Sequence, residues 1–501
     1  MAGWPSVLVA IGVALAVIVV NEESMYNRRR SRSGNPGKHN HQTKCDIFLA
    51  ILSARDHFEQ RKAVRDTWLG YIRTHPKWKK RICSKFVVGN RSCHLPLDYR
   101  RDPYSCSPLN ITKSGRQKDI VAMTVMNDTG IHRLSSGPIG FDFKVHYPII
   151  LHKLGVFDSA ADGIKHPLTV ALFDTWRQEK VVGARFSPEQ PGVFIEGYRF
   201  RAVEPYLLPK GFEGTIVVNS FNKDDPSTTL YLDEGATNNG GGVIDIQQYS
   251  RYSEDNSDFP EKVEKLDRGM AALVSGNFIY NIHEPNKLTG WMNVSDEQSS
   301  KWRVKVTNET KALELEAATY GDLLLLNVVD TYRNIPSKML QFYEWLVQLN
   351  HIEYAIKTDD DVFMNIDHIM QHFTMNKFPE PKLWWGQFRT GWTVEHHGKW
   401  AEHDYQSPVY PSFACGSGSL MSMDLVRWIA SNSRHLHRFQ GEDVSLGIWL
   451  AAVQPSYHDD PRWHCDNVCS ASMYVSAELS AEDLRTRWQN RKQCGDPCGC
   501  G

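Results

Sequence analysis

Continuous apolar runs, without the alternation of a half-buried strand, occur in two distant parts of the chain. The first spans residues 47–52 and the second residues 323–329. Such runs are typical of strands that are buried on both faces of a parallel sheet. A helical pattern over 55–71 and a short apolar run at 85–89 follow the first, so the sequence predicts a strand–helix–strand unit there.

The second run is also followed by a helical pattern. Met339, Leu340, Tyr343 and Leu346 lie at helical spacing after Pro336, which predicts an amphipathic helix with a proline in its first turn. The run 354–356 then predicts another buried strand. Two such units predict an α/β fold with a mostly parallel sheet, whose ligand lies at the carboxyl ends of the strands.

Residues 140–285 have a different pattern. Apolar and polar residues alternate strictly over 141–147, and short runs follow at 168–173, 192–203 and 215–218, separated by proline and glycine. Regularly spaced short strands predict an inserted all-β domain of the sandwich type. The insert shows no catalytic constellation, and both a lectin-like role and a structural or partner-docking role remain open.

The chain therefore divides into five predicted segments. These are an apolar leader at 1–20, a polar linker at 21–44, a first part of a catalytic domain at 45–139, the insert at 140–285, and a second catalytic part at 286–501. The leader is near the lower length limit for a membrane span, so a signal anchor, a cleaved signal peptide and a buried helix compete. Arginines at 28–30 follow it, which by the positive-inside rule favours a cytoplasmic catalytic part.

Charge and cysteine content restrict which cellular compartment and which binding partners the sequence indicates. The 57 basic and 58 acidic residues nearly cancel, so no global field indicates a nucleic-acid partner. Ten cysteines indicate disulfide bonds and an oxidising compartment, with a zinc site in 494–500 as the weaker alternative. Five N-glycosylation acceptors also favour the secretory lumen: Asn90, Asn110, Asn127, Asn293 and Asn308.

Three consecutive carboxylates, Asp359, Asp360 and Asp361, come directly after the strand predicted at 354–356. Adjacent charges repel, and the end of a buried strand is a poor place for unpaired ones. Oxygen ligands suit Mg²⁺ or Mn²⁺, so the cluster predicts a divalent-cation site. A solvated acidic turn is the alternative for an isolated run of aspartates.

Two further polar groups border the predicted cleft. Glu442 and Asp443 open a helical pattern, where acidic residues are also ordinary helix capping. Ser53, Arg55 and Arg65 follow the first strand. They are either donors to a phosphorylated ligand or part of a solvated helix face.

In order and spacing, several segments resemble the motifs of the β-1,3-glycosyltransferases of glycosyltransferase family 31. They are residues 61–68, 86–89, 320–322, 330–334, 357–365, 410–418 and 442–447. The resemblance covers 45–135 and 290–501. It implies a nucleotide-sugar-binding, GT-A-like α/β domain and an inverting transfer from a UDP-sugar, with Mn²⁺ or Mg²⁺ on the diphosphate.

Carried over by motif, the resemblance assigns roles to individual residues. Asp361 is the metal ligand, Asp443 the catalytic base, and Asp359 and Asp360 contact the donor sugar and ribose or support the metal. Ser53, Arg55 and Arg65 border the nucleotide, and Trp385 and Glu442 contact the acceptor. Many members supply a metal-binding histidine from a late strand, where this chain has residues 475–477, Val-Ser-Ala. Either His458 or His464 replaces it, or Asp361, phosphates and water hold the cation.

Within the family, the long insert, the string at 330–336 and the cysteine-rich ending are similar to members that transfer N-acetylgalactosamine. The resemblance thus implies transfer of GalNAc from UDP-GalNAc in β-1,3 linkage to a GlcNAc-terminated glycan, including an O-mannosyl glycan on a glycoprotein. It also implies a single-pass type II membrane protein of the endoplasmic reticulum or Golgi, with a lumenal catalytic domain. The alternatives are a galactosyl- or GlcNAc-transferase and a catalytically inactive, lectin-like lumenal protein.

Overall fold

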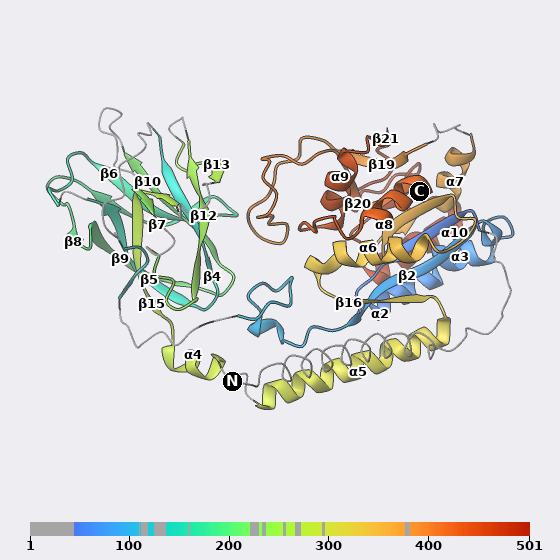
Figure 1. The fold of residues 1–501 in the computed structure, drawn as a ribbon, viewed down its shortest axis with the longest axis horizontal. Helices are drawn as coiled ribbons and strands as arrows, with labels where there is room; N and C mark the ends of the chain where they lie inside the picture. The colour runs from blue at the N-terminus through green and yellow to red at the C-terminus, as the bar shows by residue number, and fades with distance from the viewer. Residues whose placement is uncertain are drawn as a thin grey trace, which may run out of the picture. The chain divides into compact units, whose positions relative to one another are not determined.

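The computed structural model describes most of the chain beyond residue 44, as one compact unit, Cys45–Gly501. The described residues are 45–109, 111, 119–124, 137–158, 161–220, 230–232, 237–253, 257–265, 272–292, 296–375 and 381–500 (Figure 1). The leader predicted at 1–20 and the linker at 21–44 lie outside them. Within the described ranges, none of the helices combines the length and apolar character that crossing a bilayer requires.

A seven-stranded mixed sheet forms the centre of the α/β part. Its strand order is β16-β2-β1-β17-β20-β19-β21. The bounds are β1 Ile47–Leu52, β2 Ile82–Arg91, β16 Leu323–Val329, β17 Tyr354–Asp359, β19 Leu383–Arg389, β20 Phe413–Ser422 and β21 Ser456–Asp459. The first four strands run parallel, as the continuous apolar runs predict, and β20 runs antiparallel to β17 and β19.

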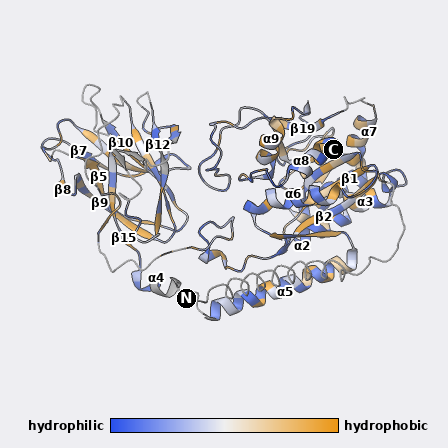
Figure 2. Ribbon diagram, viewed as in Figure 1, coloured by the Kyte–Doolittle hydropathy of each residue, from blue (hydrophilic) through white to orange (hydrophobic). Residues whose placement is uncertain are grey.

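Helices cover both faces of this sheet. The side chains of Ile47, Leu49 and Ile51 pack in one core with α2 Phe58–Asp66, α3 Trp68–Thr74, α7 Ile366–Met375 and α10 Ala481–Cys494. Phe48, Ala50 and Leu52 pack on the other face with α6 Ile335–Leu346, α8 Met423–Asn432 and α9 Glu442–Ala451. Because alternate residues of β1 enter two cores, the whole strand is apolar (Figure 2).

The helix predicted over 55–71 is two helices. Thr67 leaves the helical conformation (φ −115°, ψ −121°) between α2 and α3. Its hydroxyl donates to the carbonyl of Ala63 at 2.6 Å, which gives the backbone an alternative to a continuous helix. The helix predicted from Pro336 is α6, with the proline in its first turn.

Residues 139–282 form β-strands, in antiparallel pairs. The six-stranded sheet has the order β13-β12-β4-β10-β6-β7, the five-stranded sheet β3-β15-β5-β9-β8, and a two-stranded sheet β11-β14. The bounds are β3 Ile120–Val121, β4 Ile139–Val145, β5 Ile149–Phe157, β6 Leu168–Asp174, β7 Glu179–Phe186, β8 Val193–Ile195, β9 Tyr198–Leu208, β10 Glu213–Ser220, β11 Leu230–Leu232, β12 Ile244–Tyr252, β13 Lys262–Lys265, β14 Ala272–Val274 and β15 Gly276–Ile282.

The two larger sheets of this β-rich segment share one apolar core, which includes Phe141, Phe278 and Tyr280. Residues before the predicted boundary belong to it as well. β3 pairs with β15, and Ala122 and Met123 are buried in the same core. The β-rich structure therefore begins earlier along the chain than the alternating pattern indicated.

Smaller elements complete the fold. β18 Phe363–Met364 pairs with β22 Val475–Ser476, α4 Pro285–Met292 follows β15, and the 25-residue α5 Asp296–Tyr320 leads into β16.

All ten cysteines form disulfides. The pairs are Cys45–Cys83, Cys93–Cys106, Cys415–Cys465, Cys469–Cys498 and Cys494–Cys500. The zinc alternative for residues 494–500 is therefore wrong, because the thiolates that a zinc ion needs are oxidised.

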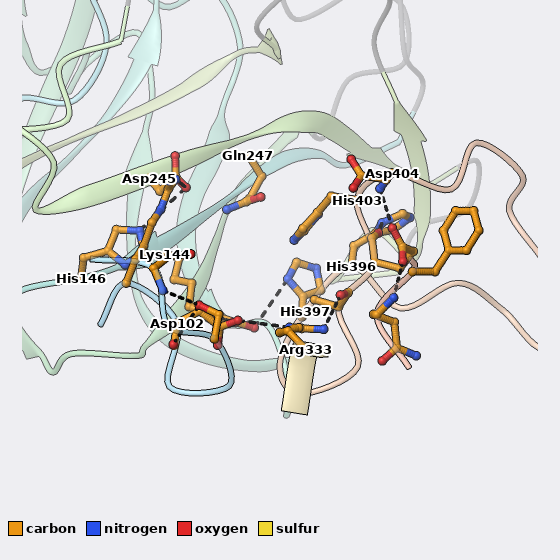
Figure 3. A pocket seen from close by; sticks show the side chains of 18 of the residues that line it. Asp102, Lys144, His146, Asp245, Gln247, Arg333, His396, His397, His403 and Asp404 are labelled. Carbon is orange, nitrogen blue, oxygen red and sulfur yellow. Dashed lines mark hydrogen bonds and ion pairs between the residues drawn. The ribbon is translucent and has the colours of Figure 1, made fainter. Parts of the chain in front are cut away.

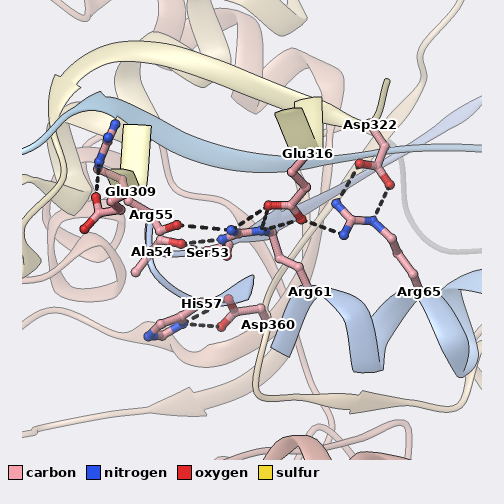
Figure 4. Close-up of polar contacts among 10 residues, drawn as sticks. All are labelled: Ser53, Ala54, Arg55, His57, Arg61, Arg65, Glu309, Glu316, Asp322 and Asp360. Atoms are coloured by element: carbon pink, nitrogen blue, oxygen red, sulfur yellow. Dashed lines mark hydrogen bonds and ion pairs between the residues drawn. The ribbon is translucent and has the colours of Figure 1, made fainter. Parts of the chain in front are cut away.

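Buried arginines join α2 to α5 (Figure 4). The Arg61 side chain is 0% exposed, donates to Glu316 of α5 at 2.8 Å, and donates to the hydroxyl of Ser53 at 2.8 Å. Arg65 pairs with Glu316 at 2.6 Å and with Asp322 at 2.9 Å. Since Ser53 directly follows β1, this network fixes the chain at the carboxyl end of that strand.

We expect Arg61→Met to destabilise the protein by about 3 kcal/mol or more, because it leaves the Ser53 hydroxyl and the Arg55 carbonyl without this donor and the buried Glu316 carboxylate with Arg65 as its remaining partner. Arg73→Met is the matched control. Arg73 also pairs with a carboxylate, Asp322, but its side chain is 35% exposed, so its loss should cost less than about 1 kcal/mol. Thermal and urea unfolding of both variants measure the difference, and equal losses would contradict this account.

Candidate active site

A pocket of about 490 Å³ lies at the carboxyl ends of β1 and β17. Ser53 and Asp359 mark these strand ends, and the segment after β16, the start of α9 and residues 389–400 supply other walls. The polar and aromatic residues that line it include Ser53, His57, Asp330, Thr331, Tyr332, Lys338, Asp359, Asp360, Asp361, Trp392, Trp400, Tyr410, Gln440, Glu442, Asp443 and Glu478. The pocket thus brings together the aspartate cluster and the Glu442–Asp443 pair, which are far apart in the sequence.

Lys357 connects these two acidic groups. Its side chain is 6% exposed, and its ammonium contacts Asp359 at 3.0 Å, Glu442 at 2.7 Å and the carbonyl of Gly416. Burial opposes the charge of this lysine, but the carboxylates of Asp359 and Glu442 outweigh that effect and raise its pKa. One buried cation therefore pairs with a carboxylate of each motif.

The three aspartates have different surroundings. Asp359 faces Lys357, and burial raises its pKa above the usual range against the effect of that lysine. Asp360 is 4% exposed and accepts from Nδ1 of His57 at 3.0 Å, a hydrogen bond that raises the pKa of the histidine. Burial and the charge of Asp360 raise the pKa of the Asp361 carboxyl, which has no salt bridge to a described cation.

This arrangement fits a divalent cation at Asp361. Its two neighbours already have cationic or hydrogen-bonding partners, whereas its own charge is compensated least, and hard oxygen ligands suit Mg²⁺ and Mn²⁺. Neither histidine considered as a second ligand lines the pocket. His458 lies beside His372 and Asp460, and His464 contacts the hydroxyl of Ser470 at 3.3 Å. The late segment in which many family members carry the histidine contributes Ala477 and Glu478 to the pocket lining instead.

The two acidic residues of α9 are also distinct. Glu442 is 7% exposed and pairs with Lys357. Asp443 is partly buried, accepts from the N–H of Val444 at 2.8 Å, and has no salt bridge among the described residues. Burial and then the Glu442 charge raise the pKa of Asp443 to about 6. Of the pair, Asp443 is the carboxylate without a salt bridge, and the charge of Lys357 lowers its pKa less than burial and the Glu442 charge raise it.

Three residues predicted for the site lie elsewhere. Arg55 does not line the pocket. It pairs with Glu309 of α5 at 2.6 Å and donates to the carbonyl of Asn90 at 2.6 Å. Arg65 is bound to Glu316 and Asp322, as described above. Trp385 is fully buried, and its ring packs edge-on against that of Trp463 at 5.3 Å.

The pocket contains residues that the sequence did not single out. Trp392 and Trp400 line it and are 44% and 49% exposed. The guanidinium of Arg389 lies 4.2 Å from the centre of the Trp392 ring and covers one of its faces. The tryptophan-rich stretch 384–400 was a signal for them, but periodicity alone does not separate a core tryptophan from a rim one. His57 and Glu478 belong to no motif that could have identified them from the sequence. Glu478 has a left-handed backbone conformation (φ +57°).

Two of the five predicted glycosylation acceptors fall on described residues. Asn90, at the end of β2, and Asn308, on α5, are both exposed. Asn110, Asn127 and Asn293 lie outside the described residues. Both described asparagines are thus accessible to modification.

Comparison with known proteins agrees with the motifs. Residues 304–461 match the family model described as galactosyltransferase. The chain is 38% identical over 466 residues to UDP-GalNAc:beta-1,3-N-acetylgalactosaminyltransferase 2 of Xenopus laevis, covering 91% of this chain and 92% of the relative. For the Homo sapiens protein of that name the identity is 37%, over 91% and 90%.

A more distant relative matches a smaller part. Beta-1,3-galactosyltransferase 6 of Mus musculus is 35% identical over 192 residues, which cover 36% of this chain and 58% of the relative. The similarity to the N-acetylgalactosaminyltransferase 2 relatives, in contrast, extends over nearly the whole length of both chains. The chain therefore belongs to the β-1,3-glycosyltransferases of glycosyltransferase family 31.

Proposed function

We propose that this protein transfers GalNAc from UDP-GalNAc, with inversion, to form a β-1,3 linkage on a GlcNAc-terminated glycan. The observation that carries the proposal is the pocket that both Asp361 and Asp443 line, while Lys357 pairs with Asp359 and Glu442 beside them. The names of the relatives similar over nearly the whole chain support the donor sugar. A galactosyl- or GlcNAc-transferase is the alternative within the same reaction class.

Inversion requires one direct displacement at the anomeric carbon. The acceptor hydroxyl attacks as the bond to the diphosphate breaks, and its proton passes to a base. Asp443 is that base, because its carboxylate lies in the pocket without a salt bridge, and burial and the Glu442 charge raise its pKa despite the charge of Lys357. Glu442, held by Lys357, orients the acceptor or supports Asp443.

The aspartate cluster holds the donor. Asp361 binds Mn²⁺ or Mg²⁺, which when bound neutralises charge on the departing diphosphate. Asp359 and Asp360 contact the sugar and ribose, with Asp360 oriented by His57. Ser53, held by Arg61, borders the nucleotide. Arg55 and Arg65 affect the nucleotide site indirectly, because their ion pairs with Glu309 and Glu316 fix α5 against the chain around α2.

The exposed faces of Trp392 and Trp400 form the acceptor platform, since an aromatic ring stacks well on the apolar face of a sugar. Trp385 lies in β19, the strand that precedes this wall, and supports the wall from the core. This assignment moves direct acceptor contact from Trp385 to Trp392 and Trp400.

The cellular setting is part of the proposal. A type II anchor at residues 1–20 would place a GT-A-like catalytic domain, with an inserted all-β domain, in the lumen of the endoplasmic reticulum or Golgi. Five disulfides and exposed acceptor asparagines support an oxidising lumen.

A lectin-like protein with an inactive transferase half is the second candidate function. The β-rich segment favours it, and the intact Asp361 and Asp443 oppose it. Mn²⁺-dependent hydrolysis of UDP-GalNAc by the purified chain distinguishes the two, because a lectin would leave the donor intact.

Asp443→Asn should lower turnover by about 10² or more while leaving UDP-GalNAc binding near normal, since it removes only the proton acceptor. Glu442→Gln is the matched control and should lower turnover less, but it should also lower the melting temperature by leaving Lys357 underpaired. Steady-state kinetics and thermal melts of both variants check this. A larger loss of turnover in Glu442→Gln would make Glu442 the base.

Turnover at saturating UDP-GalNAc and Mn²⁺ should fall as the pH is lowered through the raised pKa of Asp443, about 6. The sign follows from the mechanism, because the base acts as a carboxylate and protonation removes it. The residual activity of Asp443→Asn should lack this acidic limb. An unchanged limb in that variant would assign the titration to another group.

Asp361→Ala should abolish Mn²⁺-dependent UDP binding and transfer while the protein stays folded. Titration of free Mn²⁺, followed by electron paramagnetic resonance with and without UDP, measures binding independently of activity. Glu482→Ala, which removes an exposed carboxylate of α10, is the control and should bind as the wild type does. Full transfer by Asp361→Ala in excess chelator would refute metal-assisted chemistry at this residue.

A further inference from the structure

A second pocket, of about 460 Å³, lies next to the catalytic one and combines residues of the β-rich segment with residues of the α/β part. Lys144, His146, Glu213, Asp245 and Gln247 of β4, β10, β12 and the turn after β4 line it (Figure 3). Arg333, residues 396, 397 and 401–404, and residues 438–440 form the opposite wall. Its volume is within the range of small-ligand sites.

The two pockets share walls. Gln440 lines both of them. In the segment 395–404, Glu395, Lys399 and Trp400 line the catalytic pocket, whereas His396 and His397 line the second one. A ligand bound in the second pocket is therefore adjacent to the predicted acceptor platform.

The shared wall is anchored to the β-rich segment. Nε2 of His397 contacts the buried carboxylate of Asp142 at 3.0 Å, and the N–H of Gly398 donates to Glu213 at 3.0 Å. Arg333 donates to the carbonyl of Ala401 at 2.9 Å. These bonds fix the segment that carries Lys399 and Trp400. The two walls of the second pocket are therefore joined by an ion pair and hydrogen bonds.

The charges in this pocket are largely paired with one another. Lys144 contacts Glu213 at 2.8 Å, Arg333 contacts Asp102 at 3.1 Å, and Arg101 pairs with Asp245. The buried carboxylate of Glu402 accepts from the backbone N–H groups of Asp404 and Gln440 at 2.6 and 2.7 Å. Apart from the exposed Arg438, the ions of this lining are compensated internally, so the buried part of the pocket suits a neutral, hydroxyl-rich ligand better than a phosphate or a cation.

One buried polar atom in the lining, Nε2 of His146, makes no hydrogen bond of standard length to the described residues. The histidine is 4% exposed, and its contact with the carboxylate of Asp245, at 3.8 Å, is longer than a hydrogen bond. Because an unpaired buried polar atom costs about 1–3 kcal/mol, a ligand that bonds to this nitrogen gains what the free protein lacks.

We propose that this second pocket is an acceptor subsite that binds an inner, neutral sugar of the glycan whose terminal GlcNAc lies in the catalytic pocket. The β-rich segment thereby contributes directly to acceptor selection. This inference rests on the proposed transferase function and adds the recognition of a second sugar to it.

Acceptors of two lengths test the subsite with the full chain. One is a GlcNAc glycoside, and the others are GlcNAc-terminated disaccharides with the same aglycone and with GlcNAc, galactose or mannose as the inner sugar. The wild type should show a higher kcat/KM for at least one disaccharide. Gln247→Ala, outside the catalytic pocket, and His146→Ala should each reduce that advantage by about fivefold, which is what the loss of one hydrogen bond is worth.

Both variants should leave turnover of the monosaccharide and the KM for UDP-GalNAc unchanged. Gln190→Ala is the matched control, because Gln190 is an exposed glutamine of the same segment away from the pocket, and it should behave as the wild type. Equal use of long and short acceptors by the wild type, or an equal loss on both in Gln247→Ala, would overturn the subsite.

Binding without turnover separates this inference from the proposed function. Saturation-transfer NMR of the preferred disaccharide, or of all three if none is turned over, should show contact with its inner ring in the wild type and a weaker one in Gln247→Ala. Transfer to no acceptor together with that contact would refute the transferase but keep the carbohydrate pocket. Absence of the inner-ring contact would refute the pocket.

Discussion

The buried ammonium of Lys357 is the interaction on which the site depends most. It lies on β17, two residues before Asp359, and bonds at once to that aspartate, to Glu442 of α9 and to the carbonyl of Gly416 on β20. Without a buried cation, the carboxylates at the end of β17 and the start of α9 would repel each other across the pocket. The positive charge therefore allows two acidic motifs, more than 80 residues apart, to share one cavity.

A second layer of charge holds the scaffold around this cavity. Arg61 and Arg65 both belong to the family-like segment 61–68, and both are bound to acidic residues on α5 and directly before β16. The tryptophan of the same motif, Trp68, donates from its ring N–H to the carbonyl of Val362 at 2.9 Å, directly after the aspartate cluster. The motif thus positions both the chain after β1 and the chain after β17.

The sequence predicted the parts of the molecule that depend on local pattern. Continuous apolar runs located β1, β16 and β17, and Pro336 located the start of α6. The position of three aspartates after a buried strand was enough to predict that they line a pocket at the strand ends. What the pattern could not supply was the direction of long side chains: Arg55 and Arg65 reach α5, whose acidic residues lie some 250 positions away.

Tertiary packing also determines which tryptophan side chains are exposed to solvent. Trp385 and Trp392 are seven residues apart, but the first is in the core of β19 and the second is on the pocket rim. The same limit applies to the boundary of the β-rich segment, because the two-residue strand β3 has too few residues to show an alternating pattern and is recognised only by its pairing with β15.

The disulfide between Cys415 and Cys465 has a consequence for where the enzyme becomes competent. Both cysteines line the candidate catalytic pocket, and their bond ties the start of β20 to the segment that leads toward Ala477 and Glu478. The walls of the pocket are therefore joined by an oxidation as well as by chain folding. In a reducing compartment the newly made chain would keep these walls unlinked, so the pocket would be completed only where this disulfide can form.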